Sequence, residues 1–232
     1  MATLHGDNAR QINRIQENLL AAQERRLLNW LCARMPRWVT PDMLTAIGMV
    51  GALAVFAGYV TSNLGAEWLW LSVAGYFVQW FGDSMDGSLA RFRKIERPRY
   101  GYFLDHSCDG LATTLVVAGI GFSPYVQLSV ALVALTGYLL LSIHAFLSVR
   151  VLGEMKLSYA YAGPTELRFV LLALTFSLMA VGPEQGVIAG LSWFDLFVGG
   201  VGLLLIVFFI VQTARVASRL AVEEPPRNNR KD

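Results

Sequence analysis

Six long apolar segments limit what this chain can fold into more than any other feature. They lie near residues 41–62, 68–91, 101–122, 125–150, 165–182 and 193–219. Each reaches about 18 residues or more, the length that a helix needs to cross the hydrocarbon of a bilayer. Hydrophobic residues make up 55% of the chain, and a helix satisfies its backbone hydrogen bonds internally, as hydrocarbon requires. The sequence therefore predicts an all-α integral membrane protein with six transmembrane helices.

The distribution of basic residues predicts the orientation of these helices. All nineteen Lys and Arg residues lie before the first segment, around the second and fourth connections, or toward and after the end of the sixth segment. The connections near 63–67, 123–124 and 183–192 contain none. Because basic connections stay in the cytoplasm, we expect both termini and the 92–100 connection there. In a bacterium the location would be the plasma (inner) membrane.

The two ends of the chain differ from the apolar centre. Residues 8–35 place apolar side chains on one helical face, a pattern typical of a helix that lies in the membrane interface. We therefore expect an amphipathic juxtamembrane segment over 1–35, a six-helix membrane domain over 36–220 and a disordered cytoplasmic tail over 221–232. The basic segments are suited to contact anionic lipid headgroups. The net charge of +2 is too small to indicate a nucleic-acid partner.

Four aspartates gather between the second and third apolar segments, within residues 83–109. A carboxylate in hydrocarbon costs roughly 2.5–3.5 kcal/mol, so four together need a compensating partner. Divalent cations such as Mg²⁺ prefer oxygen ligands. Spacings of three and four residues place each pair on one helix face, and an antiparallel hairpin brings the pairs to a similar depth. The pattern predicts a metal site near the cytoplasmic face, with these ligands: Asp83, Asp86, Asp105 and Asp109.

The same stretch resembles the signature of the CDP-alcohol phosphotransferases (CDP-alcohol phosphatidyltransferases). Eight positions match the pattern Asp-x2-Asp-Gly-x2-Ala-Arg followed, after nine residues, by Gly-x3-Asp-x3-Asp. They are Asp83, Asp86, Gly87, Ala90, Arg91, Gly101, Asp105 and Asp109. The resemblance implies a metal-dependent enzyme of phospholipid synthesis. Such an enzyme uses Mg²⁺ or Mn²⁺, transfers a substituted phosphate from a CDP-alcohol to a hydroxyl acceptor, and releases CMP. It also implies a homodimer.

The resemblance assigns a role to each motif position. The aspartates bind the metal and the CDP pyrophosphate, and Asp109 is the candidate general base. Gly87, Ala90 and Gly101 leave room for the nucleotide, and Arg91 pairs with a phosphate or with the carboxylates.

Two short features resemble the choline/ethanolamine phosphotransferase branch of this family. His106 follows Asp105 directly, and Glu166 stands in a Gly-Pro-Thr-Glu sequence at the start of the fifth apolar segment. The resemblance makes His106 and Glu166 candidates for activating the lipid hydroxyl. The alternative is that His106 has no chemical role and that Glu166 only complements the N-terminus of its helix.

The sequence leaves the donor open, and other functions compete with this one. A small CDP-alcohol could transfer its headgroup to a lipid alcohol, or CDP-diacylglycerol could transfer a phosphatidyl group to a polar alcohol. The competing functions are an Asp-rich membrane prenyltransferase and a non-enzymatic ion- or proton-coupled transporter. A transporter needs acidic residues spread across the bilayer, whereas here they concentrate at one face. The Gly-x2-Ala-Arg continuation of the motif argues against a prenyltransferase.

Overall fold

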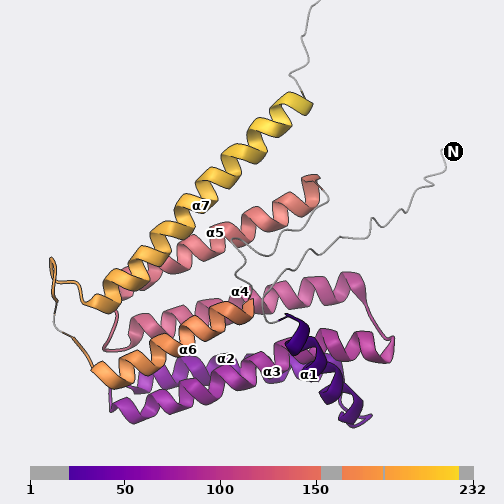
Figure 1. Ribbon diagram of the computed structural model, residues 1–232, viewed down its shortest axis with the longest axis horizontal. Coiled ribbons are helices and arrows are strands. Elements are labelled where there is room, and N and C mark those ends of the chain that lie inside the picture. The colour runs from indigo at the N-terminus through magenta and orange to yellow at the C-terminus, as the bar shows by residue number, and fades with distance from the viewer. Residues whose placement is uncertain (1–20, 153–163, 185, 225–232) are drawn as a thin grey trace, which may run out of the picture.

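The computed structural model describes residues 21–152, 164–184 and 186–224, and within these ranges it contains helices and no strand. In the described part of the chain seven α-helices follow one another, with a short 3-10 turn (η1) between the second and third (Figure 1). Their bounds are α1 Ala21–Arg34, α2 Pro41–Thr61, η1 Ala66–Trp68, α3 Leu69–Arg93, α4 Pro98–Phe122, α5 Leu128–Leu152, α6 Pro164–Val181 and α7 Trp193–Glu223.

Local sequence signals explain where the helices begin. Pro41, Pro98 and Pro164 are the first residues of α2, α4 and α6, where the missing N–H of proline costs nothing. Thr40 caps α2 by accepting a hydrogen bond from the Met43 backbone nitrogen, at 3.2 Å. At α7, Ser192 and Asp195 form a reciprocal capping box.

Each apolar segment forms a helix, so the all-helical prediction is confirmed. α2, α5 and α7 are long and apolar enough to cross a membrane, and Leu167–Val181 is a shorter apolar stretch. α3 and α4 each have 25 residues, a sufficient length, but they carry the four aspartates that lower their hydropathy. The chain is thus a helical membrane protein, and the count of six spans stays a prediction. α7 also continues to Glu223, beyond the predicted end of the last segment at 219.

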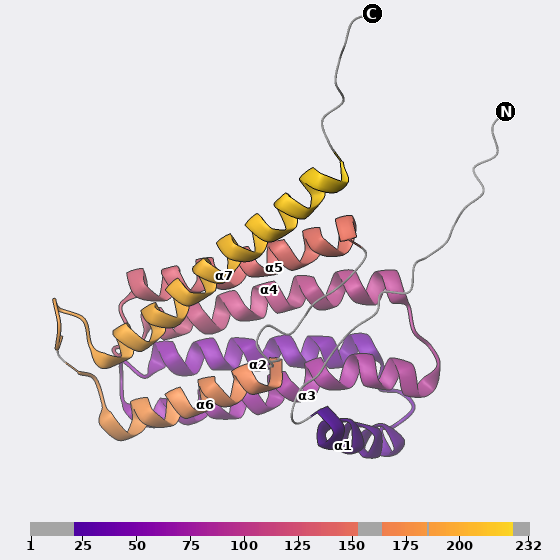
Figure 2. The same cartoon turned by 45° about the horizontal axis from the view of Figure 1, so that its top comes forward.

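The long helices run back and forth: the connections α2–α3 and α4–α5 lie at one end of the bundle, and the connection α3–α4 lies at the other (Figure 2). α2 and α3 form a central pair, against which α4 packs through α2 and α6 through α3. α4 also contacts α5, and α5 pairs with α7. This arrangement places the connection between α3 and α4 at the same end as α1.

Glycines bring α2 and α3 into backbone contact. A β-carbon added at Gly82 of α3 would lie only 2.5 Å from the Gly48 Cα and from the Leu44 carbonyl oxygen of α2. One added at Gly75 would lie 2.7 Å from the Val55 backbone nitrogen. Small residues that allow such close approach are a common means of helix association in membranes. The result is a tight pair that fixes where α3 presents its aspartates.

The first helix docks on the outer side of α3. Leu28 and Cys32 of α1 are buried in a cluster with Met85 and Leu89 of α3. The Trp80 indole nitrogen of α3 also donates a hydrogen bond to the Glu24 carboxylate, at 2.9 Å. The predicted amphipathic segment is therefore helical from Ala21 to Arg34, and its earlier part lies outside the described residues.

Arg93, at the end of α3, holds the connection between α1 and α2. Its guanidinium donates hydrogen bonds to four backbone carbonyl oxygens, at 2.5–3.4 Å. These acceptors belong to Met35, Pro36, Arg37 and Val39. The contact ties the surface segment to the helix that carries Asp83 and Asp86.

Candidate functional site

Three of the four motif aspartates line one small cavity between α2, α3 and α4. Asp83 comes from α3, and Asp105 and Asp109 come from α4. Thr45, Gly48 and Met49 of α2 form part of the wall, and the cavity has a volume of about 10 Å³. This is roughly the space that one water molecule needs, and a single metal ion is of similar size.

Asp83 is paired with a cation from another helix. Arg168, in the second turn of α6, donates from Nη2 to the Asp83 carboxylate. Its Nε donates to the Gln79 side-chain oxygen at 2.9 Å, one turn before Asp83 on α3. The Arg168 and Asp83 side chains are only 15% and 24% exposed. This pair therefore balances one of the carboxylates at the cavity.

Asp86 has neutral partners. Its Oδ2 accepts a hydrogen bond from the Thr45 hydroxyl of α2 at 2.6 Å, and its Oδ1 accepts from the Gly87 backbone nitrogen. It is not among the residues that line the small cavity. Three of the four expected metal ligands thus line this cavity, while Asp86 hydrogen-bonds to Thr45 of α2.

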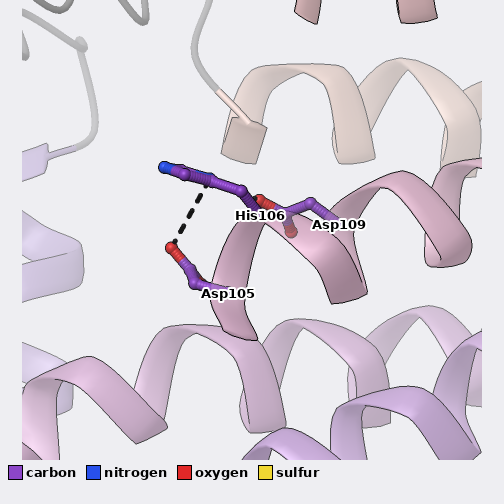
Figure 3. A group of neighbouring side chains, drawn as sticks. All are labelled: Asp105, His106 and Asp109. Atoms are coloured by element: carbon purple, nitrogen blue, oxygen red, sulfur yellow. Dashed lines mark ion pairs between the residues drawn. The ribbon is translucent and has the colours of Figure 1, made fainter. Parts of the chain in front are cut away.

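On α4, His106 lies beside both neighbouring carboxylates (Figure 3). Its Nδ1 is 3.8 Å from the Asp105 Oδ2 and 3.6 Å from the Asp109 Oδ2. One ligand atom from each of the three residues lies within 4.8 Å of the ligand atoms of the other two. The three side chains can therefore approach a common bound atom.

Aromatic rings enclose the imidazole of His106. The Tyr102 ring meets it edge-on with centroids 4.4 Å apart, and the Phe146 ring of α5 lies at 5.1 Å. The imidazole Nε2 is buried and has no hydrogen-bond partner among the described residues. A buried polar atom without a partner is costly and is common at sites that bind a ligand or transfer a proton.

The donor set around the cavity fits a divalent cation. Asp83, Asp105 and Asp109 offer carboxylate oxygens at one place, and His106 adds a nitrogen. Mg²⁺ and Mn²⁺ favour such oxygen-rich sites. Without a cation, clustered carboxylates repel one another. The cavity and its charges are thus consistent with a metal-binding site.

The remaining motif positions lie around the ends of α3 and α4. A β-carbon at Gly101 would meet nothing within 4 Å, whereas one at Gly87 would lie 3.3 Å from the Arg91 Nη1. Gly87 thus makes room for Arg91, whose exposed guanidinium donates to the Ser88 hydroxyl at 3.3 Å. Ala90 is half-buried on α3. Glu166 lies in the first turn of α6, and its side chain is outside the described part of the chain.

Sequence reasoning did not identify the side chains that partner the aspartates. Thr45, which donates to Asp86, and Gln79, which accepts from Arg168, are uncharged and match no motif. The sequence pattern marks Arg168 only as one of the basic residues around the fourth connection. One signal was present, because a charged residue next to a long apolar stretch generally has a partner or a function.

Comparisons with known proteins agree with the motif. The model of the family described as CDP-alcohol phosphatidyltransferase matches residues 38–212. Cholinephosphotransferase 1 of Danio rerio is 31% identical over 126 residues, which cover 48% of this chain and 33% of that protein. Archaetidylinositol phosphate synthase of Methanothermobacter thermautotrophicus is 31% identical over 101 residues, covering 44% of this chain and 49% of that protein.

A third relative is the CDP-diacylglycerol–serine O-phosphatidyltransferase of Encephalitozoon cuniculi. It is 31% identical over 107 residues, covering 41% of this chain and 28% of that protein. The matched part of the chain thus spans less than half the length of each of these three relatives.

Proposed function

The chain belongs to the CDP-alcohol phosphatidyltransferase family, and from this premise we propose that it is a phospholipid-synthesising transferase of substituted phosphate groups. The donor is a CDP-alcohol, the acceptor carries a hydroxyl group, and the nucleotide product is CMP. The observation that supports this most directly is the meeting of Asp83, Asp105 and Asp109, from two helices of the family motif, at one cavity.

The protein's own residues divide the work of binding and chemistry. A divalent cation, Mg²⁺ or Mn²⁺, held by Asp83, Asp105 and Asp109, with Asp86 turning from Thr45 to join them, would neutralise negative charge on the pyrophosphate. Gly87, Ala90 and Gly101 leave space for the nucleotide beside these carboxylates. The exposed guanidinium of Arg91 is free to turn from Ser88 toward a phosphate.

Proton transfer is assigned to the α4 carboxylate that lies one turn deeper than Asp105. Asp109 takes the proton of the acceptor hydroxyl as the acceptor oxygen bonds to the β-phosphorus. The bond from that phosphorus to the oxygen of CMP breaks, and CMP leaves with the electron pair. His106, with Nδ1 beside both carboxylates, either orients Asp109 or accepts the proton itself, and Glu166 acts in support.

We propose a small CDP-alcohol, such as a CDP-aminoalcohol, as the donor and a lipid alcohol as the acceptor. Two observations support this choice. The His106 imidazole lies between Tyr102 and Phe146 next to the carboxylates, and such a partly apolar setting suits a base that acts on a lipid hydroxyl. The relatives also include several cholinephosphotransferases.

A second candidate is transfer of a phosphatidyl group from CDP-diacylglycerol to a polar alcohol. The serine phosphatidyltransferase and the archaetidylinositol phosphate synthase among the relatives favour it. The same aspartates would serve either reaction, because both break the pyrophosphate of a CDP-alcohol.

The membrane arrangement is part of the proposal. α2 to α7 cross the bilayer six times as one domain, with the segment 1–35 on the membrane surface and the residues that follow α7 as a tail. The alternating connections and the basic residues support cytoplasmic placement of both termini and of the aspartates. The protein acts as a homodimer.

A panel assay on the purified protein tests the proposed activity and identifies the donor. CDP-choline, CDP-ethanolamine and CDP-diacylglycerol are each combined with diacylglycerol, serine or inositol phosphate, and both CMP and lipid product are measured. CMP release with a CDP-aminoalcohol and diacylglycerol supports the first donor assignment. Release only with CDP-diacylglycerol supports the second. No CMP release from any donor would leave the prenyltransferase and transporter alternatives.

A further inference from the structure

Arg168 bonds to two side chains of α3, and the proposed reaction gives it no role. Its guanidinium bridges Gln79 and Asp83 on α3, and Asp83 lines the cavity with Asp105 and Asp109. The arginine itself comes from α6. A cation from a different helix is therefore bound to a carboxylate that the proposed function assigns to the metal.

We infer that Arg168 is a positioning residue that neutralises Asp83 while the site lacks its metal. When the metal binds Asp83, the Nη2 end of the guanidinium turns to the phosphate of the CDP-alcohol. This inference rests on the proposed function, because it needs the metal and the pyrophosphate at this site.

The geometry explains why Arg168 can exchange partners without leaving the site. Two different nitrogens make its two contacts: Nε binds Gln79, and Nη2 binds Asp83. If the metal binds the Asp83 oxygen, the hydrogen bond to Gln79 still holds the Nε end of the guanidinium. Only the outer nitrogens need a new acceptor, and the planar guanidinium suits the oxygens of a phosphate.

The burial of this pair separates it from ordinary surface ion pairs. Arg97 and Asp42 also form an ion pair, but their side chains are 53% and 44% exposed, so solvent screens the interaction. The Arg168 and Asp83 side chains are 15% and 24% exposed. An unpaired Asp83 beside two more carboxylates would be unfavourable. A resident cation is therefore needed before the metal arrives.

Metal binding to the Arg168→Gln variant tests the first half of the inference. Free Mn²⁺ is measured by electron paramagnetic resonance in the purified full-length protein, with no substrate present. Removing a positive charge next to the site should lower the Kd for Mn²⁺ by about tenfold or more. Arg219→Gln, which removes an exposed pair with Glu223 on α7, should leave the Kd unchanged.

Nucleotide binding tests the second half. With saturating Mn²⁺, Arg168→Gln should weaken the binding of CDP by about tenfold, the factor expected for the loss of one charge-assisted hydrogen bond. Arg168→Lys keeps the charge and should bind Mn²⁺ as the wild type does. An unchanged Mn²⁺ affinity in Arg168→Gln, or an unchanged CDP affinity, would overturn the inference.

A measurement on the wild-type protein does not depend on whether the variants fold. Phenylglyoxal modifies accessible arginines, and mass spectrometry locates the product. Modification of Arg168 should be several times faster in Mg²⁺ than in chelator, while that of Arg219 should be the same in both. Equal rates at Arg168 would refute the exchange of partners. If wild-type protein binds no Mn²⁺ at all, the proposed function fails along with the inference; if it binds Mn²⁺ normally, only the inference is at risk.

Discussion

The four aspartates of the site have unequal neighbours. Asp83 faces a guanidinium, Asp86 faces a hydroxyl and a backbone nitrogen, and Asp105 and Asp109 lie beside an imidazole. Asp109 keeps 41% of its side chain exposed. It is the most exposed of the three carboxylates at the cavity, which fits its proposed role as the base.

Asp109→Asn should separate binding from chemistry. The amide still lines the cavity and leaves the other three carboxylates in place, so CDP should bind within a few fold of the wild type. Product formation should fall by about 10²–10⁴-fold, the usual contribution of a positioned base. Binding is measured by calorimetry and turnover by CMP release. An active Asp109→Asn enzyme would contradict the assignment of the base.

His106→Ala and Glu166→Gln distinguish the two donor assignments at the level of single residues. If a lipid hydroxyl is the acceptor, both variants should lose turnover on a scale similar to that of Asp109→Asn. The measurement is the rate of lipid product with each acceptor of the panel. Near wild-type rates in both variants with every acceptor would remove the choline/ethanolamine-like arrangement and favour CDP-diacylglycerol as the donor.

The sequence predicts the chemical type of the site better than its contacts. The spacing of the aspartates on two antiparallel helices is sufficient to predict their convergence, because helical periodicity is local. The pairing of Arg168 with Asp83 and of Thr45 with Asp86 depends on how α6 and α2 rotate against α3. Apolar segments that are hydrophobic on every side do not specify that rotation.

At the scale of helices, the α2–α3 pair determines the geometry of the site. Gly48 lies on the cavity wall and also at the closest approach of the two helices, opposite Gly82. Asp83 follows Gly82 directly. Any separation of α2 and α3 must therefore move Asp83 relative to the α4 aspartates.

Gly82→Ala should destabilise the protein and reduce metal binding together. The new methyl group would meet the Gly48 Cα and the Leu44 carbonyl oxygen at 2.5 Å, and both are backbone atoms that cannot rotate away. Overpacking of this kind costs about 1–3 kcal/mol. The thermal midpoint in detergent should fall. Gly200→Ala on α7, where a β-carbon would meet nothing within 4 Å, should not lower it.

Arg93 should control how firmly α1 is docked on α3. Cys32 is 2% exposed, and burial raises the pKa of its thiol, so the native protein should react slowly with maleimide. Arg93→Gln removes hydrogen bonds from a charged donor, worth about 1.5–3 kcal/mol each, and labelling of Cys32 should accelerate about tenfold or more. Mass spectrometry reports the labelled site.

Arg34→Gln is the matched control for this experiment. The Arg34 guanidinium stacks on the Trp30 ring of its own helix at 3.9 Å and donates to the Trp30 carbonyl oxygen. Its loss should leave Cys32 protected. Equal labelling rates in the wild type and Arg93→Gln would show that Arg93 does not hold α1 in place.

The helix bounds were largely predictable, and their deviations have local causes. Apolar length and proline positions locate α2 and α6 within about one residue of the expected bounds. α5 begins at Leu128 rather than near Tyr125, because the Gln127 backbone nitrogen donates to the buried Asp195 carboxylate at 2.7 Å. That contact joins the connection before α5 to the first turn of α7, far away in sequence, so no local pattern could predict it.

For the whole molecule, the central question is which side of the membrane carries the aspartates. The connection between α3 and α4, at the α1 end of the bundle (Figure 1), holds Lys94 and Arg97, whereas the connection between α2 and α3 holds no basic residue. A single cysteine introduced as Glu96→Cys, with Cys32 and Cys108 replaced by serine, should not react with an impermeant maleimide in intact cells. Leu64→Cys, in the connection before η1, should react. The reverse pattern would overturn the orientation, and reaction of both cysteines from outside would contradict the crossing by α3.

Metal-dependent release of CMP tests the account most directly. Purified wild-type protein is supplied with a CDP-alcohol and its acceptor in Mg²⁺, in excess chelator, and in chelator followed by restored Mg²⁺. We predict one CMP per lipid product formed, no turnover in chelator, recovery on restoring Mg²⁺, and no comparable recovery in Asp83→Asn. Full turnover in excess chelator would contradict the account, since the carboxylates at the cavity would then act without the cation they are proposed to hold.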